Sequence, residues 1–511
     1  MYSTVFLLIA LILGYGLSLF VKRNRLSLPP GPPRLPLIGN LHQSAKEEPW
    51  KRYQEWYETY GPIISLKYGQ KTLIVLGNHQ VTRDLLDKRS SLYSSRPQML
   101  VADRVTKGLH IGLLPYGERW KTHRRLQAGF LNVHMSQLYR DLQDIESKQL
   151  TYEMLSTNDF PGRFHRYSAS LIFALGYGKR MLRGDEHEIK EADALIKNIT
   201  EVTMPGRWLV DAFPILKYLP RCLAQWKQRG DEFHMRETSL FTRNMGRALE
   251  AKPWNWVKKV VESSKDSERV SAEELSYLVG IIYQTGGDTT AAALEVFVMA
   301  SVLHPEAVSY AQHELDDVVG TDRLPSFDDL PKLPYIDAFV KEVLRWRPIA
   351  PLGLPHSVTQ DDEYMGYLIP KGATVLPNIW SLSHENEVFE NAALFRPERW
   401  IENPNLPLDP FGFGRRICPG RHIALNSMNI IVARLLWGYD IGHDTGSVGP
   451  RADSSKLRHF GLLAQPTHFK ASFRVRGQER QSAIQREWKD SVKDTDEILD
   501  SIKAKLSSQS Y

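Results

Sequence analysis

The chain of 511 residues is poor in cysteine, with only Cys222 and Cys418. Zinc sites built from several thiolates are therefore excluded, and so is a fold held together by disulfide bonds. The formal net charge is only +6 at pH 7. No basic stripe interleaved with aromatic residues is present, so the composition does not favour a nucleic-acid-binding protein. Internal repeats and internal linkers are also lacking. We therefore expect one large domain, although the length alone would allow two or three.

Cys418 stands out because of the residues around it. It lies in a glycine-bounded loop with the sequence Phe411-Gly412-Phe413-Gly414-Arg415-Arg416-Ile417-Cys418-Pro419-Gly420. Nearby cations and the N-terminus of the helix expected at Arg421–Trp437 would stabilise a thiolate, the form of cysteine that binds metals. Gly414 and Gly420 would let the backbone turn tightly and approach a flat ligand. The loop is predicted to present sulfur to a metal in a planar macrocycle; the alternative is an ordinary buried cysteine.

This loop resembles the haem-binding loop of the cytochrome P450 family, at positions Phe411, Gly414, Arg416, Cys418 and Gly420. The resemblance implies that Cys418 is the axial ligand of haem b (iron protoporphyrin IX), with Phe411 and Arg416 in the same site. A dinucleotide-binding interpretation of Gly412-Phe413-Gly414 fails, because Ile417 occupies the third glycine position and no strand–turn–helix unit precedes it.

A second part of the resemblance is structural. Residues Lys332–Trp346 have apolar residues at helical spacing, and Glu342 and Arg345 are three apart on one face. Together with Arg399 they resemble the buried Glu–Arg–Arg network of the family, which holds the loop behind the haem. Two departures, His384-Glu385-Asn386 in place of His-Asp-Pro and Trp400 in place of phenylalanine, are expected to affect only packing.

A long apolar segment is predicted to form a helix from the capping box at Ser271 to Leu303. Its midpoint, Thr285-Gly286-Gly287-Asp288-Thr289-Thr290, is a poor helix sequence, which predicts a local opening. Asp288 and Thr289 resemble the acid–alcohol pair of the family. The resemblance implies that Thr289 hydrogen-bonds the dioxygen that the haem activates, while Asp288 relays protons. Thr285 departs from the alanine or glycine that the family usually has.

The two propionates of a haem need cationic or hydrogen-bonding partners. Trp120 and Arg124 match the propionate-binding helix of the family, and His356 and Arg416 match two further propionate contacts. Any one of them alone would more often be a solvated side chain, but the four occur in the expected order.

The N-terminus predicts a membrane anchor. Residues Val5–Val21 are nearly all apolar, long enough to span a bilayer, and the basic cluster after them favours a cytosolic body. A cleaved signal peptide is the alternative. We expect a transmembrane anchor at 1–21, a basic and proline-rich tether at 22–33, a haem domain at 34–476 and a charged, weakly ordered tail at 477–511. This layout resembles single-pass proteins of the endoplasmic reticulum membrane.

The expected fold class is mainly α (α+β): one large helical domain with small β-sheets, such as a strand pair at Ile63–Lys67 and Leu73–Leu76. The resemblance implies that electrons come from a membrane-bound NADPH–cytochrome P450 reductase. A basic face could receive this acidic donor, and it comprises Lys121, Arg124, Arg125, Arg415 and Arg421. The segments expected to contact the substrate are mostly apolar, which predicts a hydrophobic small molecule.

Three functions remain open: a monooxygenase, an oxygen-independent haem-thiolate isomerase or dehydratase, and a non-catalytic haem sensor or carrier. Asp288 and Thr289 favour the first. The chain most resembles filamentous-fungal members of mycotoxin pathways, which favours secondary-metabolite biosynthesis over detoxification or the catabolism of aromatic compounds.

Overall fold

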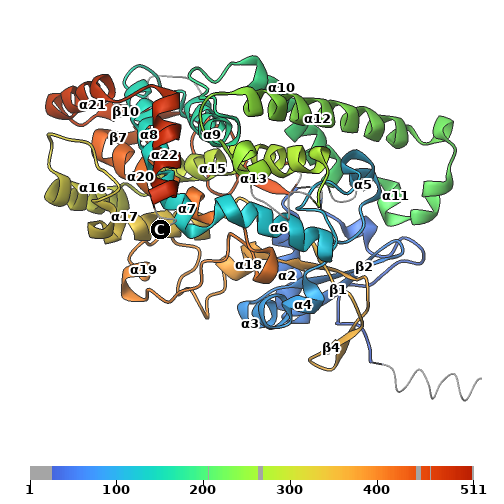
Figure 1. The fold of residues 1–511 in the computed structure, drawn as a ribbon. Helices are drawn as coiled ribbons and strands as arrows, with labels where there is room; N and C mark the ends of the chain where they lie inside the picture. The colour runs from blue at the N-terminus through green and yellow to red at the C-terminus, as the bar shows by residue number, and fades with distance from the viewer. Residues whose placement is uncertain are drawn as a thin grey trace, which may run out of the picture.

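The computed structural model describes residues 26–45, 47–204, 207–262, 269–444, 450–460 and 462–508. The anchor expected at 1–21 and the first part of the tether lie outside these residues. The described chain is mainly helical, with a few small sheets, as expected (Figure 1).

The helices in chain order are α2 (Pro49–Tyr60), α3 (His79–Thr82), α4 (Ser90–Tyr93), α5 (Leu100–Thr106), α6 (Glu118–Leu131), α7 (Val133–Leu138), α8 (Arg140–Glu153), α9 (Phe160–Tyr177), α10 (His187–Thr203), α11 (Leu209–Ala212), α12 (Gln225–Glu250), α13 (Trp256–Glu262), α15 (Ala272–Leu303), α16 (Pro305–Val319), α17 (Pro334–Trp346), α18 (Ile379–Ser383), α19 (Arg399–Glu402), α20 (Arg421–Gly438), α21 (Gln478–Asp490) and α22 (Thr495–Ser508). Shorter helical turns are η1 (Leu41–Gln43), η2 (Arg83–Lys88), η3 (Pro214–Tyr218), η4 (Arg221–Leu223), η5 (Leu330–Lys332) and η6 (Gly414–Arg416).

The strands form one four-stranded sheet and three pairs. The larger sheet has the order β1-β2-β6-β3, in which β2 and β6 are parallel and the other neighbours are antiparallel. The expected strand pair is confirmed as β1 and β2, with Ile63 opposite Leu76. The strands are β1 (Ile63–Tyr68), β2 (Lys71–Leu76), β3 (His356–Ser357), β4 (Asp362–Tyr364), β5 (Tyr367–Ile369), β6 (Thr374–Pro377), β7 (Tyr439–His443), β8 (Leu457–Phe460), β9 (Leu463–Pro466) and β10 (Ala471–Val475).

Helix α15 runs through the middle of the helical part and contacts α9, α12, α17 and α20 (Figure 1). Its start is the predicted capping box: Glu274 N–H donates to Ser271 Oγ, and Ser271 N–H donates to the Glu274 carboxylate. Among the described residues it is the one helix long and apolar enough to cross a bilayer, but 67% of that apolar stretch is buried within the protein. A helix that is apolar on all sides and buried in this way belongs to the core.

The opening expected within α15 is absent from its backbone, which stays helical from Ala272 to Leu303. The two threonine hydroxyls donate to carbonyls one turn back instead: Thr285 Oγ1 to Ile281 O at 3.0 Å, and Thr289 Oγ1 to Thr285 O at 2.8 Å. Packing against neighbouring helices therefore outweighs the poor local helix propensity of this segment.

The interpretation of residues 477–511 as a weakly ordered tail is wrong. Residues 478–490 and 495–508 form α21 and α22, which pack against α8, α9 and α20. Ile484, Leu499 and Ile502 have no exposed surface. Leu499 and Ile502 are three residues apart on one helix face. The sequence interpretation overlooked this apolar spacing because most residues around it are charged or polar.

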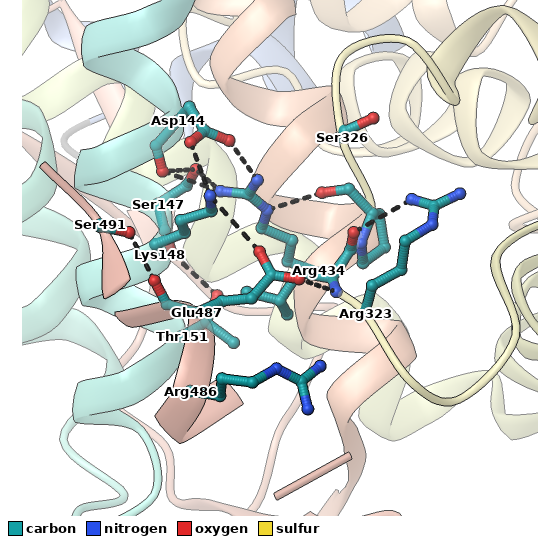
Figure 2. Close-up of polar contacts among 12 residues, drawn as sticks. Asp144, Ser147, Lys148, Thr151, Arg323, Ser326, Arg434, Arg486, Glu487 and Ser491 are labelled. Carbon is teal, nitrogen blue, oxygen red and sulfur yellow. Dashed lines mark hydrogen bonds and ion pairs between the residues drawn. The ribbon is translucent and has the colours of Figure 1, made fainter. Parts of the chain in front are cut away.

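Polar contacts attach α21 to the body, as Figure 2 shows. The Glu487 carboxylate accepts a hydrogen bond from Leu324 N–H at 2.8 Å and lies 3.4 Å from Lys148 Nζ on α8. Beside it, the buried Arg434 of α20 pairs with Asp144 of α8. Burial alone would raise the pKa of Asp144, but the charges of Arg434 and Lys148 lower it. Apolar burial and ion pairs thus fix the C-terminal helices to the body.

Replacing Leu499 by alanine should destabilise the protein by about 2–5 kcal/mol, because it removes fully buried methyl groups and leaves a cavity. The matched control is Val492→Ala, since Val492 is 50% exposed and its loss should change stability by less than about 0.5 kcal/mol. Thermal unfolding followed by circular dichroism compares the two. Equal melting temperatures for Leu499→Ala and the native chain would contradict the packed arrangement of α22.

Candidate active site

The loop that carries Cys418 is held by backbone hydrogen bonds. Cys418 N–H donates to Phe411 O at 2.9 Å, and Gly414 N–H donates to Asp87 Oδ1 at 2.7 Å. Gly414 has φ +53°, and a Cβ there would lie 2.2 Å from Leu86 O, so only glycine fits. Gly420 has φ −84°, so the turn itself does not require glycine at that position, contrary to the sequence interpretation.

The positive charges near the Cys418 sulfur come from other arginines than the two that precede it in the sequence. Burial raises the pKa of the thiol, whereas the N–H of Gly420 and the charges of Arg124 and Arg421 oppose this effect. The arginines that favour the thiolate are thus Arg124 on α6 and Arg421 on α20. Arg415 and Arg416, which precede the cysteine in sequence, direct their side chains to Tyr116 and Trp120 instead. Binding a metal would supply the remaining stabilisation of the thiolate.

Arg416 is held over Trp120. Its guanidinium carbon lies 4.4 Å from the centre of the Trp120 ring, a cation–π contact. The same guanidinium donates to the backbone oxygens of Ser94 and Leu114, both at 2.6 Å. Arg415 instead bonds the Tyr116 hydroxyl. The structure therefore brings Trp120 and Arg416 together, as predicted.

His356 and Arg96 complete a buried group of basic side chains. Arg96 is 9% exposed and donates to the oxygens of Leu354 and Pro355, directly before His356. Burial and the charges of Arg96 and Arg124 lower the pKa of Arg416 to about 8. Burial, together with the charge of Arg96, lowers the pKa of His356 to about 3.

This group is short of negative charge. In the described part of the chain, no carboxylate forms an ion pair with Arg96 or Arg416, whose charged groups contact backbone oxygens and an aromatic ring. Buried cations without an anion are costly. The two propionates of a haem would compensate the positive charges of Arg96 and Arg416. Trp120, His356 and Arg416 therefore fit the predicted cofactor, and Arg96 joins them.

Arg124 acts on both Arg416 and the cysteine loop, because its charge helps to lower the pKa of Arg416. Arg124 Nη2 donates to Ile417 O at 2.7 Å, the residue directly before the cysteine. Arg421, in turn, donates to Cys418 O at 3.3 Å. Both arginines therefore support the loop and the sulfur. Phe411 packs partly buried against the main core and accepts the hydrogen bond from Cys418 N–H.

The Glu–Arg–Arg network is confirmed. The Glu342 carboxylate is fully buried and accepts two bonds from Arg345, at 2.7 and 2.8 Å, and one from Arg399 Nε at 3.2 Å. Trp400 Nε1 donates to the same carboxylate at 2.9 Å. The expectation that Trp400 affects only packing is therefore wrong, because phenylalanine has no such donor. Burial alone would raise the pKa of Glu342, but the hydrogen bonds and the positive charge of Arg345 lower it.

Glu385, which stands where the family usually has aspartate, also forms a polar contact. Glu385 lies 2.6 Å from Nδ1 of His79, and Nε2 of the same ring lies 3.1 Å from Asp409. Burial opposes charging of this ring, but the hydrogen bonds to Asp409 and Glu385 raise the pKa of His79. Since Asp409 directly precedes the Pro410–Phe411 start of the cysteine loop, Glu385 helps to anchor that loop through His79. An aspartate side chain at 385 would be one methylene shorter.

The predicted acid–alcohol pair lies on α15, which packs against α20 after the cysteine loop. Thr289 Oγ1 donates to Thr285 O, whereas Asp288 Oδ1 lies 3.5 Å from Nε2 of His165 on α9. The two side chains thus point to different partners. Sequence reasoning missed His165, as it missed the placement of Arg96, because a lone histidine or arginine has no local pattern that marks it.

Comparison with known proteins agrees with this site. The family model described as Cytochrome P450 matches residues 29–473. The chain is 47% identical over 497 residues to cytochrome P450 monooxygenase aneD of Aspergillus aculeatus, covering 96% of both chains. It is 46% identical over 480 residues to cytochrome P450 monooxygenase drtD of Aspergillus calidoustus, covering 94% of this chain and 91% of that protein. It is also 47% identical over 498 residues to cytochrome P450 monooxygenase FrzL of a Cladobotryum species, covering 96% of both chains.

The family model and the three relatives match nearly the whole chain, and the helical fold and the glycine-bounded cysteine loop agree with this match. The chain therefore belongs to the cytochrome P450 family, whose members hold a protoporphyrin IX haem by a cysteine thiolate, and it is a monooxygenase.

Proposed function

We propose that this monooxygenase binds haem b through the Cys418 thiolate and oxidises a hydrophobic small molecule, using dioxygen and electrons from NADPH–cytochrome P450 reductase. The observation that carries the proposal is the placement of Cys418 in a loop fixed by backbone hydrogen bonds, with Arg124 donating to Ile417 O and Arg421 to Cys418 O on either side of the sulfur. The other cysteine, Cys222, is exposed on the short turn η4.

The roles of the surrounding residues follow from their contacts. The propionates would be held by Trp120, Arg124, His356 and Arg416, with Arg96 as a further cation. Arg124 also supports the sulfur side through Ile417 O. Bound haem would supply the activation of dioxygen, which needs an electron-rich thiolate on the opposite face. Thr289 Oγ1 carries a proton that it donates to a carbonyl within the helix. In the proposed reaction this hydroxyl passes protons to the reacting oxygen, and the adjacent Asp288 replaces them.

Secondary-metabolite biosynthesis is the proposed pathway class. Its support is the similarity to monooxygenases of Aspergillus and Cladobotryum, which are filamentous fungi. The substrate class is supported by apolar side chains in the segments expected to contact it: Leu113, Leu114 and Leu352 are all buried, and Ile349 is partly buried. Apolar linings with few polar groups favour hydrophobic ligands.

The proposed electron donor docks on the basic face near Cys418. Arg415 and Lys121 both lie over the Tyr116 ring, at 5.3 and 5.6 Å from its centre. Arg124 and Arg421 bond the backbone on either side of the sulfur. These cations gather on the side of the loop where an acidic reductase would deliver electrons, and such charge complementarity speeds association.

Membrane attachment is proposed through an anchor at 1–21 and a tether at 22–33, with the haem domain from 34 to 476 in the cytosol at the endoplasmic reticulum. An exposed apolar patch supports this, made up of Leu37, Leu209, Ile215, Tyr218 and Leu223, which are 65–88% exposed. The turn between β1 and β2 connects its two parts, since Gly69 N–H donates to Ile38 O and Gln70 N–H to Ala212 O, both at 3.2 Å. Large exposed apolar patches mark interaction sites.

Replacing Cys418 by serine should abolish the thiolate-type absorption shift of the reduced carbon monoxide complex, because an alcohol oxygen cannot replace the soft sulfur ligand. The matched control, Cys222→Ser, removes the exposed thiol and should retain the shift. Retention of the shift in Cys418→Ser would rule out the ligand assignment.

Replacing Thr289 by alanine should lower the product formed per NADPH by about tenfold, with peroxide released instead, because a proton-transfer group is lost. Product is measured with ¹⁸O₂, which also tests the monooxygenase chemistry in the native chain. Thr290→Ala removes the neighbouring hydroxyl and serves as control. Tight coupling in Thr289→Ala would contradict the role of Thr289, and product without label would favour the isomerase or dehydratase alternative.

A polarity-sensitive dye attached to Cys222 should shift its emission to the blue when vesicles are added to the holoprotein. Cys222 adjoins Leu223 in the apolar patch, so membrane contact would move the dye into a less polar environment. As control, the dye is attached in Cys222→Ser/Val492→Cys, since Val492 is exposed in the connection between α21 and α22. Equal emission with and without vesicles at position 222 would exclude contact of this patch with the membrane.

A further inference from the structure

A charged cleft of about 920 Å³ opens beside the middle of α15. Its walls come from α9, α10, α15 and the β8–β9 pair. The charged or titratable groups that line it near Asp288 are His165 on α9, Asp193 and Lys197 on α10, Glu295 on α15, and Arg458 on β8. The charged groups of this cleft have no part in the pocket expected for the substrate, so they need a different explanation.

His165 occupies the centre of the charged groups. Its Nε2 lies 3.3 Å from Asp193 Oδ1 and 3.5 Å from Asp288 Oδ1, so one ring N–H faces two carboxylates from two other helices. Tyr283 fixes Asp193 from the other side through a hydroxyl bond of 3.1 Å. The side chains of His165, Asp193 and Asp288 are 26%, 31% and 27% exposed, and therefore partly open to solvent.

The charge state of this histidine follows from its partners. Hydrogen bonds to Asp193 and Asp288 raise the pKa of His165 to about 10, against the effect of burial. The ring is therefore an imidazolium at neutral pH. Burial raises the pKa of nearby Glu295 to about 7, so this group is partly protonated and adds little negative charge there. Lys197, Arg207 and Arg458 are the other cations that line the cleft. Its remaining titratable groups are Glu201 and His468.

An imidazolium held so firmly is a poor proton donor. Loss of its proton would break its pairing with both Asp193 and Asp288. Hydronium or a buffer acid of the solvent, which reaches the open cleft through water, is the better source. What His165 does supply is a fixed positive charge and a fixed N–H, which hold the Asp288 carboxylate toward the cleft.

We propose that His165 is a positioning residue for proton delivery: it holds the Asp288 carboxylate at the cleft wall, where a proton from the solvent, carried by cleft water, reaches Asp288 before passing to Thr289. No bond to carbon or iron changes in this step; hydronium or a buffer acid of the solvent gives up one proton, one Asp288 carboxylate oxygen receives it through cleft water, and water or the buffer base remains. The inference rests on the proposed role of Asp288. A purely structural role for His165, that of joining α10 to α15, is the competing explanation.

The first test compares His165→Gln, His165→Arg and the native holoprotein, with reductase and NADPH at pH 7.5. His165→Gln keeps a hydrogen-bond donor but no charge, and it should lower the product per NADPH by about tenfold. His165→Arg restores the cation and should restore coupling. The matched control is His187→Gln, which removes an exposed histidine 3.3 Å from Glu191 on α10 and should remain coupled.

The second test is a pH profile, which a structural tether would not move. Coupling should fall as the imidazolium loses its proton, at high pH in the native chain. Asp193→Asn removes one of the two carboxylates that raise the pKa of His165, so this alkaline limb should move to lower pH. In His165→Arg the limb should disappear. NMR titration of ¹³C-labelled histidine, assigned with His165→Gln, gives the pKa of His165 independently of turnover.

The outcomes separate the two proposals. If Asp288→Asn uncouples the enzyme and His165→Gln does not, only the inference about His165 is wrong. If Asp288→Asn remains coupled, the proposed relay itself fails and the role of His165 falls with it. An alkaline limb that stays in place in Asp193→Asn, while NMR shows a lowered His165 pKa, would also overturn the inference. If His165→Gln does not fold, the Asp193→Asn profile decides.

Discussion

The buried carboxylate of Glu342 is the constraint on which the proximal side of the molecule depends. It has no exposed surface, and it is satisfied by Arg345, Arg399 and the Trp400 indole. Removing one partner from such a group leaves a buried charge uncompensated, at about 3–5 kcal/mol. Helix α17 and the segment 396–400 can therefore adopt only one relative arrangement, and the cysteine loop follows that segment closely.

The loop is then fixed at several points by elements remote in sequence. His79 on α3 forms an ion pair with Asp409 just before the loop, Asp87 on η2 accepts from the Gly414 N–H, and Arg124 on α6 donates to Ile417 O. The sulfur is thus placed by contacts from three helical segments rather than by the loop alone. Such preorganisation suits a site that must hold a rigid, planar cofactor, because no ordering of the loop is required on binding.

Two charged regions of the molecule differ in whether carboxylates neutralise their cations. Around Arg96 and Arg416, cations contact carbonyls and a ring without a carboxylate, an arrangement that attracts an anionic ligand. In the cleft beside α15, His165 faces two carboxylates and the charges are nearly balanced. A balanced, partly solvated cluster attracts no particular ion but keeps water and ionised groups in place. The first arrangement fits cofactor binding, and the second fits proton supply.

The sequence by itself determined the features whose cause is local. The capping box at Ser271, the helix that carries Glu342 and Arg345, the pairing of β1 with β2, and the loop around Cys418 all follow from spacing or glycine placement, and the structure contains each of them. Tertiary structure decided the rest. Trp400 bonds Glu342 58 residues away, Arg124 rather than Arg416 faces the sulfur, and α22 is ordered by burial. His165 meets Asp288 across 123 positions of sequence (288 − 165). Hydrogen bonds and ion pairs act within a few ångströms, so which distant side chains share them depends on how the helices pack, and no local pattern records that.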